Sequence, residues 1–150
     1  MMSLSGRCVA AVALIILTAS SAFADPETIS IAKLETVLKQ NPLPPGDPGA
    51  SMVGSLRAGE ASLGVLVMRE NRLHHHVAQD HVLYLVRGTG IARLESANGA
   101  IETRSIGPGD ILTLPRGRKH GFKKSSDEDL VFLVAANPVP SGVEETTYDE

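Results

Sequence analysis

The sequence predicts an all-β domain of the sandwich or barrel type. From residue 52 onward, short runs of apolar and β-branched residues alternate with turn-forming residues, which is typical of antiparallel β proteins. The runs that we expect to form strands cover residues 63–68, 81–86, 91–95, 101–105, 111–114 and 130–135. Glycine, proline, asparagine and aspartate mark the turns between them, as at Asn98-Gly99. With 150 residues and no internal repeat, the chain is expected to form one such domain.

The first 24 residues have the pattern of a secretory signal peptide. Arg7 supplies a positive charge, residues 9–17 form an apolar run, and Ala-Phe-Ala at residues 22–24 precedes a cleavage point. Cleavage there would remove Cys8, the only cysteine, so the sequence predicts an exported protein, periplasmic or secreted, without disulfides. Because Cys8 precedes the apolar run and the run is short for a membrane span, we expect no lipid anchor and no stable membrane anchor.

Residues 25–50 are expected to contain a short N-terminal helix and a proline-rich linker. Residues 30–40 carry apolar side chains at helical spacing, with Ser30 as a candidate N-cap. Four prolines and two glycines between residues 41 and 49 then predict the end of the helix and a linker. The barrel itself is expected over residues 51–137, followed by an acidic C-terminal tail over residues 138–150.

The clearest indication of function is the placement of the histidines. The chain has five, of which four lie close together and the fifth lies far along the chain. Neutral imidazole is the commonest protein ligand of transition metals, and residues two apart on a strand share a face. His74 and His76 can therefore point to one side while His75 points away. A fold that brings His81 and His120 to the same side would complete a metal site.

Two segments around these histidines resemble the two sequence motifs of the cupin superfamily. The first family motif is commonly written G-x5-H-x-H-x3,4-E-x6-G, and the second G-x5-P-x-G-x2-H-x3-N. Residues 109–122, GDILTLPRGRKHGF, match the second motif as far as its histidine, whereas Lys124 stands where the family often has asparagine. Residues 74–90 match the first motif from its H-x-H to Gly88, but Met68 replaces its leading glycine.

The resemblance implies a cupin-type double-stranded β-helix, or jelly-roll barrel, with one divalent metal bound among histidines. It implies His74, His76 and His120 as ligands and puts His81 where the family usually has glutamate. Asp80 remains an alternative fourth ligand, because the motif allows a gap of three or four residues. Nitrogen ligands favour iron, manganese, copper, nickel or zinc over magnesium and calcium, and four neutral imidazoles would leave the ion's double charge uncompensated.

Side-chain parity also suggests pocket residues and a subunit contact. If His81 faces inward, Leu83 does as well, and Phe122 shares the side of His120. Leu83 and Phe122 would then either line a substrate pocket or belong to the core. The opposite face of the predicted strand over residues 81–86 would carry a row of apolar side chains. This row could pair two subunits into a homodimer, as in many cupins. The row consists of Val82, Tyr84 and Val86.

Composition and motifs argue against several other functions. The formal net charge is −3, from 14 basic and 17 acidic residues, and no basic face indicates nucleic-acid binding. No nucleophile elbow and no phosphate-binding glycine loop is found in the sequence. A local basic cluster beside His120 is either a solvated loop rim or a guide for an anionic substrate. The cluster consists of Arg116, Arg118, Lys119, Lys123 and Lys124.

These observations predict an exported metal-binding cupin. The favoured interpretation is a metal-dependent, dioxygenase-like oxidoreductase that acts on a small molecule. Its catalytic residues are not assigned, because no general base can be identified from the sequence. The alternative is a non-catalytic periplasmic protein that binds a metal or a small molecule.

Overall fold

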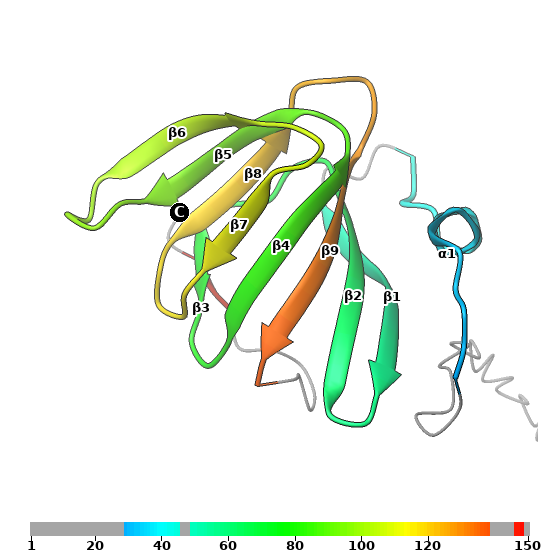
Figure 1. Ribbon diagram of the computed structural model, residues 1–150. Helices are drawn as coiled ribbons and strands as arrows, with labels where there is room; N and C mark the ends of the chain where they lie inside the picture. Colours follow the sequence, from blue (N-terminus) through cyan, green and yellow to red (C-terminus); the bar gives the residue numbers. More distant parts are fainter. Residues whose placement is uncertain (1–28, 46–48, 139–145, 149–150) are drawn as a thin grey trace, which may run out of the picture.

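Two antiparallel β-sheets that face each other form the protein (Figure 1). The computed structural model describes residues 29–45, 49–138 and 146–148, so the predicted signal peptide, residues 1–24, lies outside the described residues. The strands are β1 (Ala50–Ala58), β2 (Ala61–Met68), β3 (His74–His76), β4 (Asp80–Arg87), β5 (Gly90–Glu95), β6 (Ile101–Ile106), β7 (Ile111–Leu114), β8 (His120–Lys124), β9 (Leu130–Asn137) and β10 (Thr146–Tyr148).

The strand order within each sheet is that of a jelly roll. One sheet has the order β1-β2-β9-β4-β7 and the other has the order β10-β3-β8-β5-β6. Strands far apart in the sequence are therefore neighbours, such as β2 with β9 and β5 with β8. This arrangement is the double-stranded β-helix that the cupin resemblance implies, and all six segments predicted as strands are strands. The all-β fold class and the cupin-type barrel are confirmed.

The main core lies between the two sheets and follows the predicted parity of β4. His81, Leu83 and Leu85 are buried, whereas Val82 and Tyr84 on the other face are exposed. Burial alternates in this way because successive side chains of a strand point to opposite faces of the sheet. His81 and Leu83 therefore face the interior, as the sequence predicted.

Two motif glycines occupy backbone conformations that other residues rarely adopt. Gly88 has a φ of 76°, and a Cβ atom at this position would lie 2.6 Å from the carbonyl oxygen of Asp129. Gly117 has a φ of 75° in the turn between β7 and β8. A side chain at either position would strain the turn, which gives a physical reason for these glycines in the motifs.

The short helix α1 (Leu34–Gln40) packs on the outer face of the first sheet, beside β1 and β2 (Figure 1). Its apolar side chains contact a second buried cluster that includes Val65 of β2. Gly54 makes this contact possible, since a Cβ there would lie 2.7 Å from Val37. The prediction of Ser30 as the N-cap is wrong. The helix begins at Leu34, its N-cap residue is Lys33, and no side chain caps it. No helix in the described part of the chain is long and apolar enough to cross a membrane.

The C-terminal stretch that the sequence marked as an acidic tail contributes a strand to the second sheet. Strand β10 pairs with β3, and this pairing sets Tyr148 opposite His74 and Thr147 opposite His75. The remaining residues beyond Pro138 lie outside the described part of the chain. The pairing matters for function because β3 carries the histidine pair of the first motif.

Candidate metal centre

Three histidines from two neighbouring strands converge between the sheets. His74 and His76 belong to β3 and His120 opens β8, and the two strands pair through His74 and His120. One ring nitrogen of each residue lies within 4.8 Å of one ring nitrogen of each of the others. Their ring centroids are 4.5 to 5.1 Å apart. The structure therefore brings together the two histidines of the first motif, His74 and His76, and the histidine of the second motif, His120.

Backbone carbonyls orient two of the three rings. The Nδ1 atom of His74 lies 2.8 Å from the carbonyl oxygen of Arg72, and that of His120 lies 3.0 Å from the carbonyl oxygen of Arg118. Because a carbonyl oxygen only accepts, each Nδ1 carries the proton and donates it. The Nε2 lone pair of each ring is then available for a metal, which is the usual way in which proteins fix a histidine ligand.

Two histidines of the cluster, His76 and His120, are held in the neutral form that binds metals. Burial lowers the pKa of His76 from its ordinary value of 6.5 to about 3, with a further contribution from the neighbouring imidazoles. Burial likewise lowers the pKa of His120 to about 4. Near neutral pH these imidazoles carry no proton on the coordinating nitrogen, so a metal binds without first displacing one.

His81 lies beside the cluster as a fourth histidine. Its ring centroid is 4.2 Å from that of His76, yet its nitrogens are not among the three that converge. Its Nε2 lies 3.4 Å from Oε1 of Gln79, whose own amide nitrogen donates to the carbonyl of Pro138. Burial lowers the pKa of His81 too. A role as fourth ligand stays a prediction, and it requires His81 to give up the contact with Gln79.

Asp80, the alternative fourth ligand, is bound to Arg116. Its carboxylate accepts hydrogen bonds from the Arg116 backbone nitrogen at 2.9 Å and from the guanidinium at 2.6 Å. These bonds hold the pKa of the carboxyl at about 2, and the side chain is half-exposed. Asp80 is not part of the convergent group, and neither is His75. The geometry favours His81 over Asp80.

Two substitutions distinguish these candidates. We expect Asp80→Asn to keep one metal per chain, because the carboxylate is engaged by Arg116 rather than by the cluster. We expect His81→Ala to weaken metal binding by about ten- to a hundredfold, the usual cost of disturbing a group next to the primary ligands. Competition with a chelator of known affinity measures both. Loss of metal in Asp80→Asn with unchanged affinity in His81→Ala would make Asp80 the ligand.

The turn between β7 and β8 holds the two motifs together. The backbone nitrogen of Gly117 donates to the carbonyl of His76 at 2.8 Å, next to the ion pair between Arg116 and Asp80. At the other end of the turn, a carboxylate oxygen of Glu95 accepts a hydrogen bond from the backbone nitrogen of Lys119 at 3.0 Å. These contacts fix the segments that carry the histidines relative to each other.

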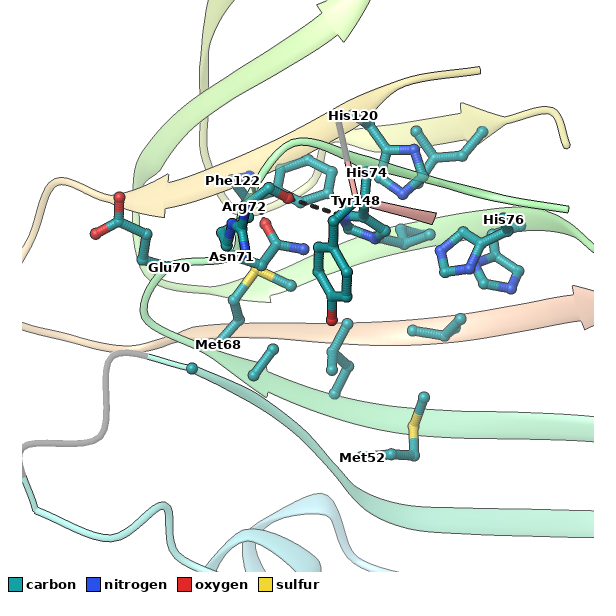
Figure 2. Close-up of a pocket in the computed structure, with 17 residues that line it drawn as sticks. Met52, Met68, Glu70, Asn71, Arg72, His74, His76, His120, Phe122 and Tyr148 are labelled. Atoms are coloured by element: carbon teal, nitrogen blue, oxygen red, sulfur yellow. Dashed lines mark hydrogen bonds between the residues drawn. The ribbon is translucent and has the colours of Figure 1, made fainter. Parts of the chain in front are cut away.

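A cavity of about 850 Å³ opens beside the histidines (Figure 2). Its volume suits a small organic molecule. The histidine cluster and His81 line it, and both predicted pocket residues, Leu83 and Phe122, do so as well. Most of the remaining wall is apolar. This apolar part includes Leu66, Met68, Leu114 and Val134.

The basic cluster beside His120 does not line this cavity. Most of its members instead form ion pairs with carboxylates on the surface. The pairs are Arg116 with Asp80, Arg118 with Glu95, Lys123 with Glu70 and Lys124 with Asp129. Of the two interpretations drawn from the sequence, these pairs favour a solvated loop rim.

Sequence reasoning missed four polar residues of the cavity, namely Glu70, Asn71, Arg72 and Tyr148. Arg72 precedes His74 by two residues, so an extended chain puts both on the same side, and this spacing could have revealed it. Tyr148 reaches the site through the pairing of β10 with β3, for which the sequence gives no local signal.

Known proteins that resemble the chain share its fold. None of the protein-family models compared with the chain matches it. Acireductone dioxygenase from Bacillus cereus is 30% identical over 79 residues, which are 53% of this chain and 46% of that protein. The corresponding protein from Bacillus cytotoxicus is 29% identical over 90 residues, 57% of this chain and 52% of that protein. The chain thus spans about half the length of these relatives.

Solved structures with the same architecture share little sequence with the chain. An oxalate oxidase structure superposes with a TM-score of 0.62 at 15% identity, covering 98% of this chain and 75% of that one. A double-stranded β-helix protein from Klebsiella pneumoniae superposes with a TM-score of 0.56 at 20% identity, covering 76% of this chain and 94% of that one. The chain therefore has the cupin fold. Within that fold it carries a cluster of three histidines suited to a divalent metal.

Proposed function

We propose that the protein is an exported, metal-dependent cupin oxidoreductase that acts on a small organic molecule with dioxygen as the oxidant. The observation that carries the proposal is the position of the three imidazoles, whose nitrogens lie within 4.8 Å of one another on the wall of the cavity. A metal held there would have protein ligands on one side and room for a substrate on the other. The name of its relatives, acireductone dioxygenase, supports an oxygen-dependent reaction.

The donor set fits a transition metal. His74, His76 and His120 would hold it, with His81 as the candidate fourth ligand, and imidazole nitrogens suit iron, manganese, copper, nickel or zinc. When bound, a redox-active metal would supply electron transfer between substrate and oxidant. The carbonyls of Arg72 and Arg118 would orient the rings of His74 and His120, burial would keep His76 and His120 neutral, and the apolar wall would exclude water.

A non-catalytic protein that binds a metal or a small molecule is the second candidate, and one observation favours it. Among the described residues that line the cavity, the only carboxylate belongs to Glu70, and it is paired with Lys123 at 3.1 Å. In the described part of the chain, no free carboxylate at the site therefore offers a general base. Turnover would need a substrate that is already deprotonated or that loses its proton on binding.

Oxygen uptake distinguishes the two candidates. The protein, purified without a histidine tag, would be loaded separately with Fe(II), Mn(II), Cu(II) or Zn(II) and given enolic and phenolic compounds in an oxygen electrode. We expect uptake with at least one redox-active metal, none with zinc, and none with any metal in His120→Ala. Tight binding of one metal without uptake, or easy removal of the metal by a mild chelator, would favour the binding protein.

The proposal includes export and a homodimer. The signal-peptide pattern of residues 1–24 supports export. The outer face of β4 supports a dimer, because Val82 and Tyr84 are exposed and Ile111 on β7, which pairs with Tyr84, is 68% exposed. Apolar side chains gathered in this way are typical of a subunit interface. A monomer in sedimentation experiments would contradict the dimer.

A further inference from the structure

Arg72 presents a guanidinium group to the cavity. It lines the wall near the cluster, and its carbonyl oxygen is the one that orients His74. Its guanidinium carbon lies 5.3 Å from the centre of the Tyr148 ring, a cation–π contact. Among the described residues the guanidinium forms no ion pair, unlike most members of the basic cluster beside His120. Its N–H donors are therefore available to a ligand.

Tyr148 stands at the opening of the same cavity. Its ring centroid is 6.0 Å from that of His74, so the ring contacts the histidine on one side and Arg72 on the other. Figure 2 shows the hydroxyl pointing away from β3 and across the opening toward the facing sheet. The hydroxyl forms no hydrogen bond to any described residue. A hydroxyl in this position can donate a hydrogen bond to a bound oxygen.

The charge balance of the wall favours an anion. Apart from the histidines, of which His76 and His120 are neutral, the charged residues in the described part of the cavity lining are Glu70 and Arg72. Lys123 pairs with Glu70, so its negative charge is compensated. Arg72 is exposed on the wall of this cavity of about 850 Å³, and no described carboxylate pairs with its positive charge, to which a bound metal would add.

We propose that Arg72 and Tyr148 bind the carboxylate of the substrate, so that the metal site acts on a small organic acid with an apolar body. The planar guanidinium offers two parallel N–H groups that match a carboxylate, and the phenol supplies a further donor. The apolar wall would contact the body of the molecule and direct its other end toward the histidines. This inference rests on the proposed function, since it names the class of molecule that enters the same cavity.

Phenylacetate and phenylacetamide provide a matched pair of probes, because they share an apolar body and differ in charge. Calorimetric titration of the metal-loaded protein should show phenylacetate binding about tenfold more tightly than the amide. Arg72→Gln should abolish this preference without changing the metal content, and Arg72→Lys should restore part of it. Tyr148→Phe should weaken phenylacetate binding about threefold. Arg104→Gln, which removes an exposed arginine of β6, should behave as the unchanged protein.

The remaining outcomes separate this inference from the proposed function. Three outcomes would overturn the inference: equal affinity for the two probes, no binding of either, or an unchanged preference in Arg72→Gln. If the protein still bound a metal, the proposed function would not be affected by them. A preference that survives in Arg72→Gln but disappears on metal removal would put the carboxylate on the metal, which also overturns it. A preference that depends on Arg72 in a protein that binds no metal would support the carboxylate site and refute the proposed function.

Discussion

Replacement of His120 by alanine is expected to abolish stoichiometric metal binding and to leave the barrel folded. His120 supplies one of the three nitrogens that converge among the described residues, so its loss leaves two of them, and His81 could add a third only by giving up its contact with Gln79. The surrounding sheet does not depend on the ring, since β8 pairs with β5 through its backbone. His76→Ala is expected to act in the same way. Elemental analysis gives the metal per chain, and circular dichroism reports the fold.

His75→Ala is the matched control for these variants. His75 lies between His74 and His76 on β3 but does not belong to the convergent group. Its removal should leave the metal content at one per chain. If both His76→Ala and His120→Ala kept their metal, the site would not be where the structure shows it.

The metal-free protein is expected to lose stability as the pH falls from about 6.5 towards 4. The pKa of His76 is lowered to about 3 and that of His120 to about 4, whereas both titrate near 6.5 in the unfolded chain. Between these values the unfolded state binds more protons than the folded state. The free energy of unfolding therefore decreases as the pH is lowered, by up to roughly 1.4 kcal/mol per pH unit for each histidine.

Urea unfolding of the metal-free protein at pH 7, 6 and 5 measures this slope. His120→Asn serves as the comparison, because it replaces the titrating ring by a neutral amide. It should reduce the slope by the contribution of one proton, roughly 1.4 kcal/mol per pH unit. Bound metal should suppress the effect, because it occupies the nitrogens that would take up protons. The same free energy of unfolding at all three pH values would show that the imidazoles are not buried as described.

Much of the fold was predictable because local patterns determined it. Apolar runs bounded by turn residues gave six strands within a few residues, and alternation on β4 correctly oriented His81 and Leu83. The cupin resemblance then implied the pairing of strands far apart in the sequence, which no periodicity can reveal. The convergence of His74, His76 and His120 follows from that pairing, since β3 and β8 meet at two of the three residues.

Other features depended on contacts that the sequence does not encode locally. The helix begins after Lys33 rather than after Ser30, because its apolar residues are fixed by packing on the sheet and no side chain caps it. Strand β10 is only three residues long and is defined by its partner β3, so Tyr148 could not be predicted at the site. The ion pair between Asp80 and Arg116, which bears on the open choice between His81 and Asp80, becomes visible only in the folded chain.

Elemental analysis of the protein, purified from an exporting host without a histidine tag, tests the central claim most directly. The account predicts about one redox-active transition metal per chain that withstands mild chelation, because the nitrogens of three imidazoles lie within 4.8 Å of one another. An empty site, or a mixture of weakly held ions, would contradict a metal-dependent oxidoreductase.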